Sequence, residues 1–270
     1  MSNPVTRVEN IARAGFLARG IVYILLGYFA FTTRGIAEEG TGGVLAEIYD
    51  VPGGTVLLGL IAVGLAGYGF FRLYDAIVGL EPQSAGWKGQ AVRVGHGASG
   101  VAHFFLAATA VKLAVSSGQN AAAQAGESQK DAAATVLSMP FGSLVLAIVA
   151  AGFLFAALQQ AKKAWSGKFM AKLDANAPAI VEPVGRVGYA ARAIVFLLVG
   201  YMLVRASMFE SAQEAGGVGE VFSQLSGFGI FYMMVAVGLL MFGMFSLVMA
   251  RYRRIRDEDV IERIKALRFA

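Results

Sequence analysis

The sequence has 270 residues, of which 57% are hydrophobic and only 15% are charged. This balance lies far outside that of soluble domains and predicts a protein that crosses a membrane several times. The formal net charge is +5, and the absence of cysteine excludes disulfides, zinc thiolates and thiol catalysis.

Six apolar stretches have the length of roughly 20 residues that a helix needs to cross the hydrocarbon core. In chain order they are Phe16–Thr33, Thr55–Leu73, His96–Val115, Phe141–Gln160, Gly188–Ser207 and Phe228–Ala250. The first stretch lacks a small-residue cleavage site, so we expect a permanent helix and not a signal peptide. We therefore predict an all-α integral membrane protein with six transmembrane helices.

The first, third and fifth stretches open on the same block. Its three copies are Arg13–Tyr23 (RAGFLARGIVY), Arg93–His103 (RVGHGASGVAH) and Arg186–Phe196 (RVGYAARAIVF). Each block is followed by a polar loop and a second apolar stretch, so the repeat unit is a two-helix hairpin.

The second stretches also resemble one another. They begin at Val51-Pro-Gly-Gly54, Met139-Pro-Phe-Gly142 and Ser226-Gly-Phe-Gly229, and ten residues further on, or nearly so, lie Gly64, Gly152 and Gly238. Proline suits a helix start because its missing N–H would be unpaired there. We predict three parallel tandem hairpins within residues 1–80, 81–170 and 171–250, followed by a tail at 251–270. Packed as a ring, they would be related by a pseudo-threefold axis along the membrane normal.

These motifs carry a resemblance to a known family. The triple R-x-G-x-x-A opening, the P-x-G starts and the G-L-x-x-x-G run at Gly64–Gly69 resemble the bacterial membrane proteins grouped as domain of unknown function 1206. The resemblance covers residues 11–80, 91–167 and 184–256. It implies three two-helix units in a bacterial inner membrane, and it implies no activity and no active-site residues.

Lysine and arginine resist translocation in short loops, so their positions predict the orientation of the chain. All but four of the 23 basic residues fall in the N-terminal segment, the second and fourth loops and the tail, counted with the adjoining helix ends. The exceptions are Arg34, Lys112, Lys130 and Arg205. We expect an N-in/C-in arrangement with both termini in the cytoplasm, and the net charge then requires no nucleic-acid partner.

Two stripes run along the first helix of each repeat. One stripe is small and predicts close helix packing: Gly20 and Gly27, Gly100 and Ala107, and Ala193 and Gly200. The other is polar and aromatic: Phe16, Arg19 and Tyr23, then His96, Ser99 and His103, then Tyr189, Arg192 and Phe196. Arg19 and Arg192 each lie six residues beyond the arginine that opens their block, roughly 9 Å deeper at helical rise.

Burying a guanidinium at this depth costs a few kcal/mol unless it snorkels to the headgroups or finds a partner. The six predicted stretches contain no carboxylate, which leaves two interpretations open. In the simpler one, both arginines snorkel to the cytoplasmic headgroups. In the other, the three stripes converge into a site for an anion or lipid headgroup, with a carbonyl, an aromatic face, Asp75, Glu182 or the anion itself as the partner. The candidate residues are Arg19, Arg192, His96, Ser99, His103, Tyr23 and Tyr189.

His96 and His103 are the only histidines and lie on one helix face about 10 Å apart. Two ligands on the same side of one helix cannot both bind one iron, so we expect packing histidines and neither haem nor another cofactor. We find no nucleophile triad, phosphate loop or metal cluster in the sequence, and therefore expect no enzyme. The tail, with a basic run at Arg251–Arg256 and apolar residues at helical spacing, fits an amphipathic helix on an anionic leaflet or a docking helix equally well.

Two functions fit this pattern. The first is an accessory or scaffold protein of the bacterial inner membrane that packs against lipid, another membrane complex or further copies of itself. The alternative is a small channel or carrier for an anionic solute or lipid headgroup around the pseudo-threefold axis. An axis lined by the polar stripes favours the second function, and an axis closed by glycine and alanine favours the first.

Overall fold

The computed structural model describes residues 4–32, 40–79, 86–115 and 130–253, and within them the chain is helical and forms no β-strand. The long helices are α1 (Pro4–Thr32), α4 (Gly54–Val78), α5 (Trp87–Val115), α7 (Gly142–Ser166), α8 (Val181–Met208) and α10 (Gly229–Tyr252). The shorter elements are α3 (Gly40–Asp50), a helical segment at 130–137, α9 (Val218–Leu225) and the 3-10 turns Lys168–Lys172 and Ala212–Glu214. The residues from 254 onwards, which include most of the predicted amphipathic tail, lie outside the described part.

All six long helices are long and apolar enough to cross a membrane, which confirms the predicted number of spans. Several spans continue further than the apolar stretches indicated. In particular, α4 runs past Leu73 to Val78, so that Asp75 lies within the helix and is fully buried. Glu9 and Glu182 also lie inside candidate spans. The expectation that the spans contain no carboxylate is therefore wrong, because a helix does not end where its first charged residue appears.

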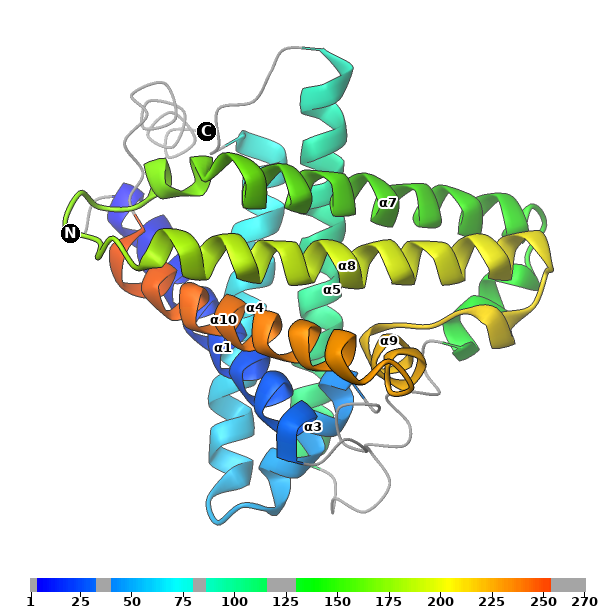
Figure 1. The fold of residues 1–270 in the computed structure, drawn as a ribbon, viewed down its shortest axis with the longest axis horizontal. Helices are drawn as coiled ribbons and strands as arrows, with labels where there is room; N and C mark the ends of the chain where they lie inside the picture. The colour runs from blue at the N-terminus through cyan, green and yellow to red at the C-terminus, as the bar shows by residue number, and fades with distance from the viewer. Residues whose placement is uncertain (1–3, 33–39, 80–85, 116–129, 254–270) are drawn as a thin grey trace.

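The helices pack by a rule that the repeats share. The second helix of each repeat packs most extensively against the first helix of the next: α4 on α5, α7 on α8 and, from the third repeat back to the first, α10 on α1. Figure 1 shows these three pairs as a fan, with α7 and α8 running across the view, α4 and α5 running up it, and α1 with α10 on the diagonal. Contacts within a repeat are less extensive, between α1 and α4 and between α8 and α10.

The second repeat departs from the other two, because the described parts of α5 and α7 do not pack against each other as hairpin partners. In the first repeat, a Cβ atom added to Gly64 would lie 2.5 Å from Cβ of Ala18, and in the third, one added to Gly238 would meet Ala191. The equivalent Gly152 has nothing within 4 Å of such an atom, and the matching Ala98 is exposed. The predicted three-repeat organisation stands, and among the described residues only the first and third repeats pack their own two long helices against each other.

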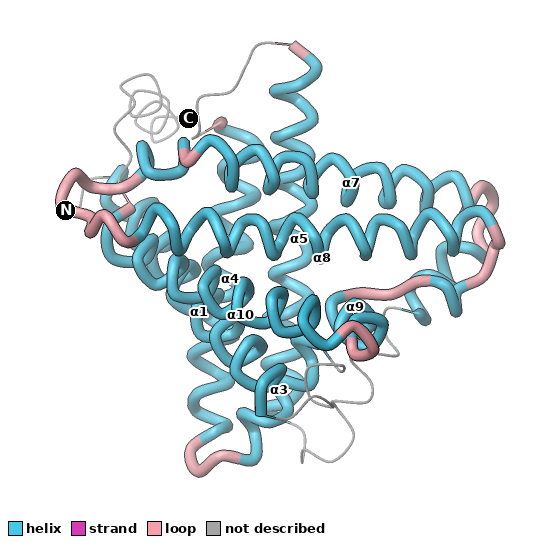
Figure 2. Tube along the Cα trace, viewed as in Figure 1, coloured by secondary structure: helices cyan, strands magenta, loops and turns pink. Residues whose placement is uncertain are grey.

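One end of the molecule gathers the start of α1, the end of α10 and the connection between α7 and α8. Arg13 Nη2 donates to the carbonyl oxygen of Arg253 (3.4 Å), and the amide of Asp174 donates to the carbonyl oxygen of Tyr252 (2.8 Å). Leu173 and Arg253 also form an isolated antiparallel bridge. Figure 2 shows the connecting loops at the two ends of the helices. We call the end with the α7–α8 connection the terminal end.

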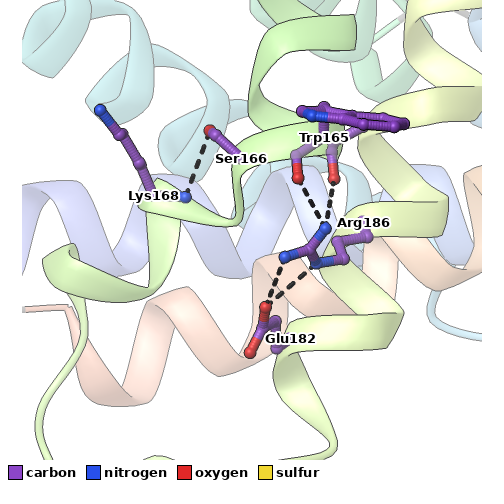
Figure 3. Close-up of polar contacts among 6 residues, drawn as sticks. Trp165, Ser166, Lys168, Glu182 and Arg186 are labelled. Carbon is purple, nitrogen blue, oxygen red and sulfur yellow. Dashed lines mark hydrogen bonds and ion pairs between the residues drawn. The ribbon is translucent and has the colours of Figure 1, made fainter.

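The predicted boundary arginine of the third repeat fastens this connection (Figure 3). Arg186 Nη1 donates to the carbonyl oxygen of Trp165 (2.6 Å), and Nε and Nη2 donate to Oε1 of Glu182 (3.0 and 2.8 Å). Gly167 caps the C-terminal end of α7. Its φ of 62° is the left-handed conformation that glycine accepts without strain. Glu182 is therefore a partner of Arg186 and not of the deeper Arg192.

Candidate functional site

Arg19 joins three helices near the terminal end. Its Nε and Nη2 donate to the hydroxyl oxygen of Ser246 on α10 (3.2 and 3.0 Å), and its Nη1 donates to the hydroxyl oxygen of Tyr68 on α4 (2.5 Å). The guanidinium carbon lies 4.8 Å from the ring centroids of Phe16, Tyr68 and Phe242. Only 6% of the residue is exposed, so the interpretation that Arg19 snorkels is wrong. Two hydroxyl groups and three aromatic faces take the place of water around it.

Arg192, at the same position of the third repeat, has a different environment. Its guanidinium carbon lies over Phe242 (4.5 Å), Phe196 (4.7 Å) and Tyr23 (5.5 Å), so it also faces the interior between α8, α1 and α10. Its Nε is buried and has no hydrogen-bond partner, and no ion pair joins it to a described carboxylate. The residue is half-buried. Arg192 therefore has aromatic contacts but unused hydrogen-bond donors.

Phe242 connects the two arginines. The guanidinium carbon of Arg19 lies 4.8 Å from its ring centroid, and that of Arg192 lies 4.5 Å from it. The distance between the two carbons therefore cannot exceed the sum of these two distances. The ring of Tyr23 packs edge-on against Phe242 (5.1 Å between centroids), and Tyr189 does the same (5.5 Å). Arg19, Arg192, Tyr23 and Tyr189 therefore lie together, as the converging stripes of the sequence predicted.

The second repeat contributes His103 to this cluster. The ring of His103 lies 4.5 Å from that of Tyr68, and its Nδ1 is 2.7 Å from the carbonyl oxygen of Ser99, one turn back on the same helix. Tyr68 places His103 beside Arg19, because the hydroxyl oxygen of Tyr68 accepts from Arg19 Nη1. Ser99 takes part through its backbone. The expected packing role of His103 holds, although its hydrogen bond lies within its own helix and not across helices.

His96 belongs to a separate buried group on α4 and α5. Its Nδ1 lies 2.7 Å from Oδ2 of Asp75, and Nη1 of Arg72 donates to the same oxygen (3.3 Å). Asp75 is fully buried and His96 is 4% exposed. Asp75 therefore lies beside Arg72 and His96 and is not the partner of Arg19. Arg72 links this group to the cluster, because its guanidinium carbon lies 5.8 Å from the ring centroid of Tyr68.

The repeat alignment accounts for Ser99, which stands where the other two copies carry Arg19 and Arg192. Eight residues after the equivalent glycines Gly64, Gly152 and Gly238, the second helices carry Arg72, Gln160 and Ser246. Each of these helices packs on the first helix of the next repeat. Each interface thus combines one arginine with one neutral polar residue: Arg19 with Ser246, Arg72 with Ser99, and Arg192 with Gln160. At the interface of α4 with α5, the arginine lies on the second helix of the pair's first repeat and the neutral residue on the first helix of the next, which is the reverse of the other two interfaces.

We call Arg19, Arg72 and Arg192 the arginine triad. The guanidinium carbons of Arg19 and Arg72 both lie over the ring of Tyr68 (4.8 and 5.8 Å), and those of Arg19 and Arg192 both lie over Phe242, so the three arginines are linked through two shared rings. Of the three, only Arg72 has a carboxylate partner among the described residues. The triad therefore carries an excess of positive charge in an aromatic interior, which suits an oxyanion with several acceptor oxygens.

Sequence reasoning missed the second-helix members of the site, which are Tyr68, Arg72, Phe242 and Ser246. A signal for them did exist, because Tyr68 and Phe242 both lie four residues after the repeated glycine and Arg72 and Ser246 lie eight after it. Within the described residues, no group of three or more histidine, aspartate or glutamate side chains could hold a metal ion.

The small-residue stripes pack as predicted. A Cβ atom added to Gly20 would lie 2.6 Å from Leu247 of α10, and one added to Gly27 would lie 2.7 Å from Leu240 of the same helix. Gly100 approaches Leu73 of α4 in the same way (2.8 Å), and Gly200 approaches Leu154 of α7 (2.8 Å). Glycine and alanine therefore close the helix pairs, whereas the centre near the terminal end is occupied by arginine and aromatic side chains.

Comparisons with known proteins agree with the three-repeat organisation. Residues 14–79, 94–167 and 187–253, well over half of the chain, match the family described as Domain of Unknown Function (DUF1206). A protein of Bacillus subtilis (strain 168), named as the uncharacterized protein YxxB, is 29% identical over 262 residues, which cover 93% of each chain. No solved structure matches the chain.

Proposed function

The chain belongs to the DUF1206 family of membrane proteins of unknown function, and from this premise we propose that it binds an oxyanion such as phosphate at the arginine triad, without catalysing a reaction. The proposal rests chiefly on Arg192. A guanidinium that is turned inward from a candidate span and left without a hydrogen bond is costly unless a ligand supplies the acceptor. An oxyanion that accepts from Arg192 and lies near Arg19 and Arg72 would satisfy this requirement.

The surrounding groups support an anion in preference to a cation or a neutral solute. Arg19 is already held by two hydroxyl groups, and Arg72 by Asp75, so both are fixed in place before a ligand arrives. Preorganised donors lose little conformational freedom on binding, which favours affinity. The described residues around Phe242 offer no carboxylate that would repel the anion.

We further propose that the terminal end faces the cytoplasm of a bacterium and that the protein resides in its inner membrane. The support for this is the distribution of lysine and arginine over the loops. In this orientation, the triad would be reached from the cytoplasmic leaflet or its headgroup layer.

An accessory or scaffold role is the second candidate, and the exposed faces of α5 and α7 favour it. These two helices are the least buried of the six candidate spans, and large apolar side chains such as Phe105 and Ile148 are more than half exposed. Such a surface suits lipid or another membrane helix. A channel or carrier would use the same triad, and differs from simple binding only in releasing the anion on the other side.

The test replaces Arg192 by glutamine and measures binding of inorganic phosphate and of short-chain phosphatidylglycerol to the purified protein in a neutral detergent. Loss of one charge-assisted contact should weaken binding by roughly tenfold or more. Arg205→Gln on the same helix is the matched control, because Arg205 is paired with Glu214 (3.1 Å) and lies far from Phe242. Unchanged affinity of Arg192→Gln for both probes would contradict the proposal, as would equal losses in the two variants.

A further inference from the structure

The second repeat leaves an opening in the cycle of helices. The helices follow one another in the order α5, α4, α1, α10, α8 and α7, and each packs on its neighbours. The described residues of α5 and α7, the first and last of this series, do not form such a packed pair. A closed cycle would need a sixth contact between α5 and α7, of the kind that α1 makes with α4 and α8 makes with α10. We call this interruption the α5–α7 opening.

The residues at the α5–α7 opening have the chemistry of a surface that contacts lipid. Ala98 and Gly152, which correspond to the packed Ala18–Gly64 and Ala191–Gly238 contacts, are both exposed. Their neighbours at helical spacing are apolar and more than 40% exposed: Val94, Val101 and Phe105 beside Ala98, and Val145, Ile148 and Val149 beside Gly152. The opening is therefore apolar along both helices.

Two residues of the site lie on helices that border the α5–α7 opening or pack directly on one of them. Arg192 is on α8, which packs on α7, and His103 is on α5. Both residues are half-buried, whereas Arg19, on the far side of the cycle between α1 and α10, is almost completely buried. The site is thus positively charged inside and bounded by apolar side chains where the cycle is open.

We infer that the oxyanion is the phosphate of a membrane phospholipid, which reaches the arginine triad sideways through the α5–α7 opening while its acyl chains stay between α5 and α7. The inference rests on the proposed function and specifies its ligand. A phospholipid combines the two properties that the site shows side by side, an anionic head for the arginines and apolar chains for the helix faces. A free phosphate would satisfy only the first.

The first experiment tests whether the opening exists in a bilayer. The chain has no cysteine, so pairs of spin labels can be placed without background. Equivalent exposed or half-exposed pairs are Leu17 with Val63, Gly97 with Ala151, and Ala190 with Val237. In nanodiscs containing phosphatidylglycerol, we expect short label distances in the first and third pairs and a clearly longer one in the second. Three equal distances would mean that the second hairpin is closed, and would overturn the inference.

The second experiment asks whether lipid occupies the opening. A phosphatidylglycerol with a photoreactive diazirine on one acyl chain is incorporated into vesicles with the full-length protein, and labelled peptides are identified by mass spectrometry. We expect α5 and α7 to be labelled at least several-fold more than the exposed face of α4. Gly152→Leu should reduce this labelling, whereas Gly59→Leu on α4, whose glycine also has open space around it, should not.

The outcomes separate this inference from the proposed function. If Arg192→Gln weakens phosphate binding but labelling is spread evenly over all exposed helices, the triad binds a free anion and the lateral route is wrong. If labelling is concentrated at α5 and α7 but is the same in Arg192→Gln, Arg205→Gln and the unaltered chain, lipid fills the opening without using the triad, and the inference also fails. Concentrated labelling that Arg192→Gln and Gly152→Leu both reduce is the expected result.

Discussion

Arg19 and Arg192 occupy the same position of two repeats, yet their surroundings assign them different roles. Both lie over Phe242, one at 4.8 Å and the other at 4.5 Å. Arg19 donates three hydrogen bonds to two hydroxyl groups, whereas Arg192 donates none to the residues that the structure describes. At the equivalent position of the neighbouring second helix, α10 offers Ser246 to Arg19, while α7 carries Gln160, whose Oε1 accepts no hydrogen bond from a described residue.

This comparison shows how a repeated motif can be structural in one copy and available for binding in another. A buried arginine with its donors satisfied contributes packing between helices. The same side chain without those acceptors is held in place by aromatic rings but keeps its affinity for an anion. The Oε1 atom of Gln160 is itself buried without a hydrogen-bond partner, so the third-repeat interface is polar and incompletely satisfied.

Truncation of the two arginines should give the largest contrast. Arg19→Ala should lower the free energy of unfolding by about 2–3 kcal/mol, because it leaves a cavity between three helices and strands the hydroxyl group of Tyr68. Arg192→Ala should cost less than about 1 kcal/mol, since the side chain is half-buried and has no polar partner to lose. Unfolding in mixed micelles with increasing dodecyl sulfate measures both. Equal losses would show that the two arginines are equivalent and would remove the basis of the comparison.

The hairpin glycines extend the comparison from side chains to whole repeats. Gly64→Ala should destabilise the protein by roughly 1–2 kcal/mol, because the new Cβ would lie 2.5 Å from that of Ala18. Gly152→Ala should instead stabilise it by about 0.5–1 kcal/mol through helix propensity, since the added atom meets open space. The same unfolding assay distinguishes the two. Destabilisation by Gly152→Ala would indicate that α5 and α7 pack together after all.

Removal of a single hydroxyl group is the finest test. Tyr68→Phe removes the acceptor of Arg19 Nη1 and should cost about 1 kcal/mol. Tyr23→Phe is the matched control: its ring packs on Phe242, but its hydroxyl group forms no hydrogen bond in the described structure, so the change should cost less than about 0.3 kcal/mol. A loss for Tyr23→Phe as large as that for Tyr68→Phe would mean that the hydroxyl group of Tyr23 also serves an arginine.

Much of the fold could be predicted because membrane helices are specified locally. Apolar length determines the number of spans, and the repeated block at Arg13, Arg93 and Arg186 gives the three units. Helix ends were less predictable. The helix α4 continues through Asp75, whose carboxylate contacts Arg72 and His96, and hydropathy measures neither of these two side-chain interactions.

The candidate site was predicted in part. Helical spacing correctly gathered Arg19, Arg192, Tyr23 and Tyr189, because residues on one face of equivalent helices face the same interior. It could not assign His96 to Asp75. Nor could it relate Ser99, which occupies the position of Arg19 and Arg192, to Arg72, since Arg72 lies on a helix whose neighbour is known only once the helices are packed.

By itself, the sequence determined the helix count, the three repeats and the small residues that allow close packing, since all of these depend on composition and spacing along the chain. Only the tertiary structure decided which helices are neighbours. In the described part of the chain, this packing leaves α5 and α7 apart and Arg192 without a hydrogen-bond acceptor. Helix packing depends on the fit of whole surfaces and not on the repeat alone. Sequence repetition would make the three interfaces alike. In the described part of the packed chain, Arg19 is held by hydroxyl groups, Arg72 is paired with Asp75, and Arg192 has no polar partner.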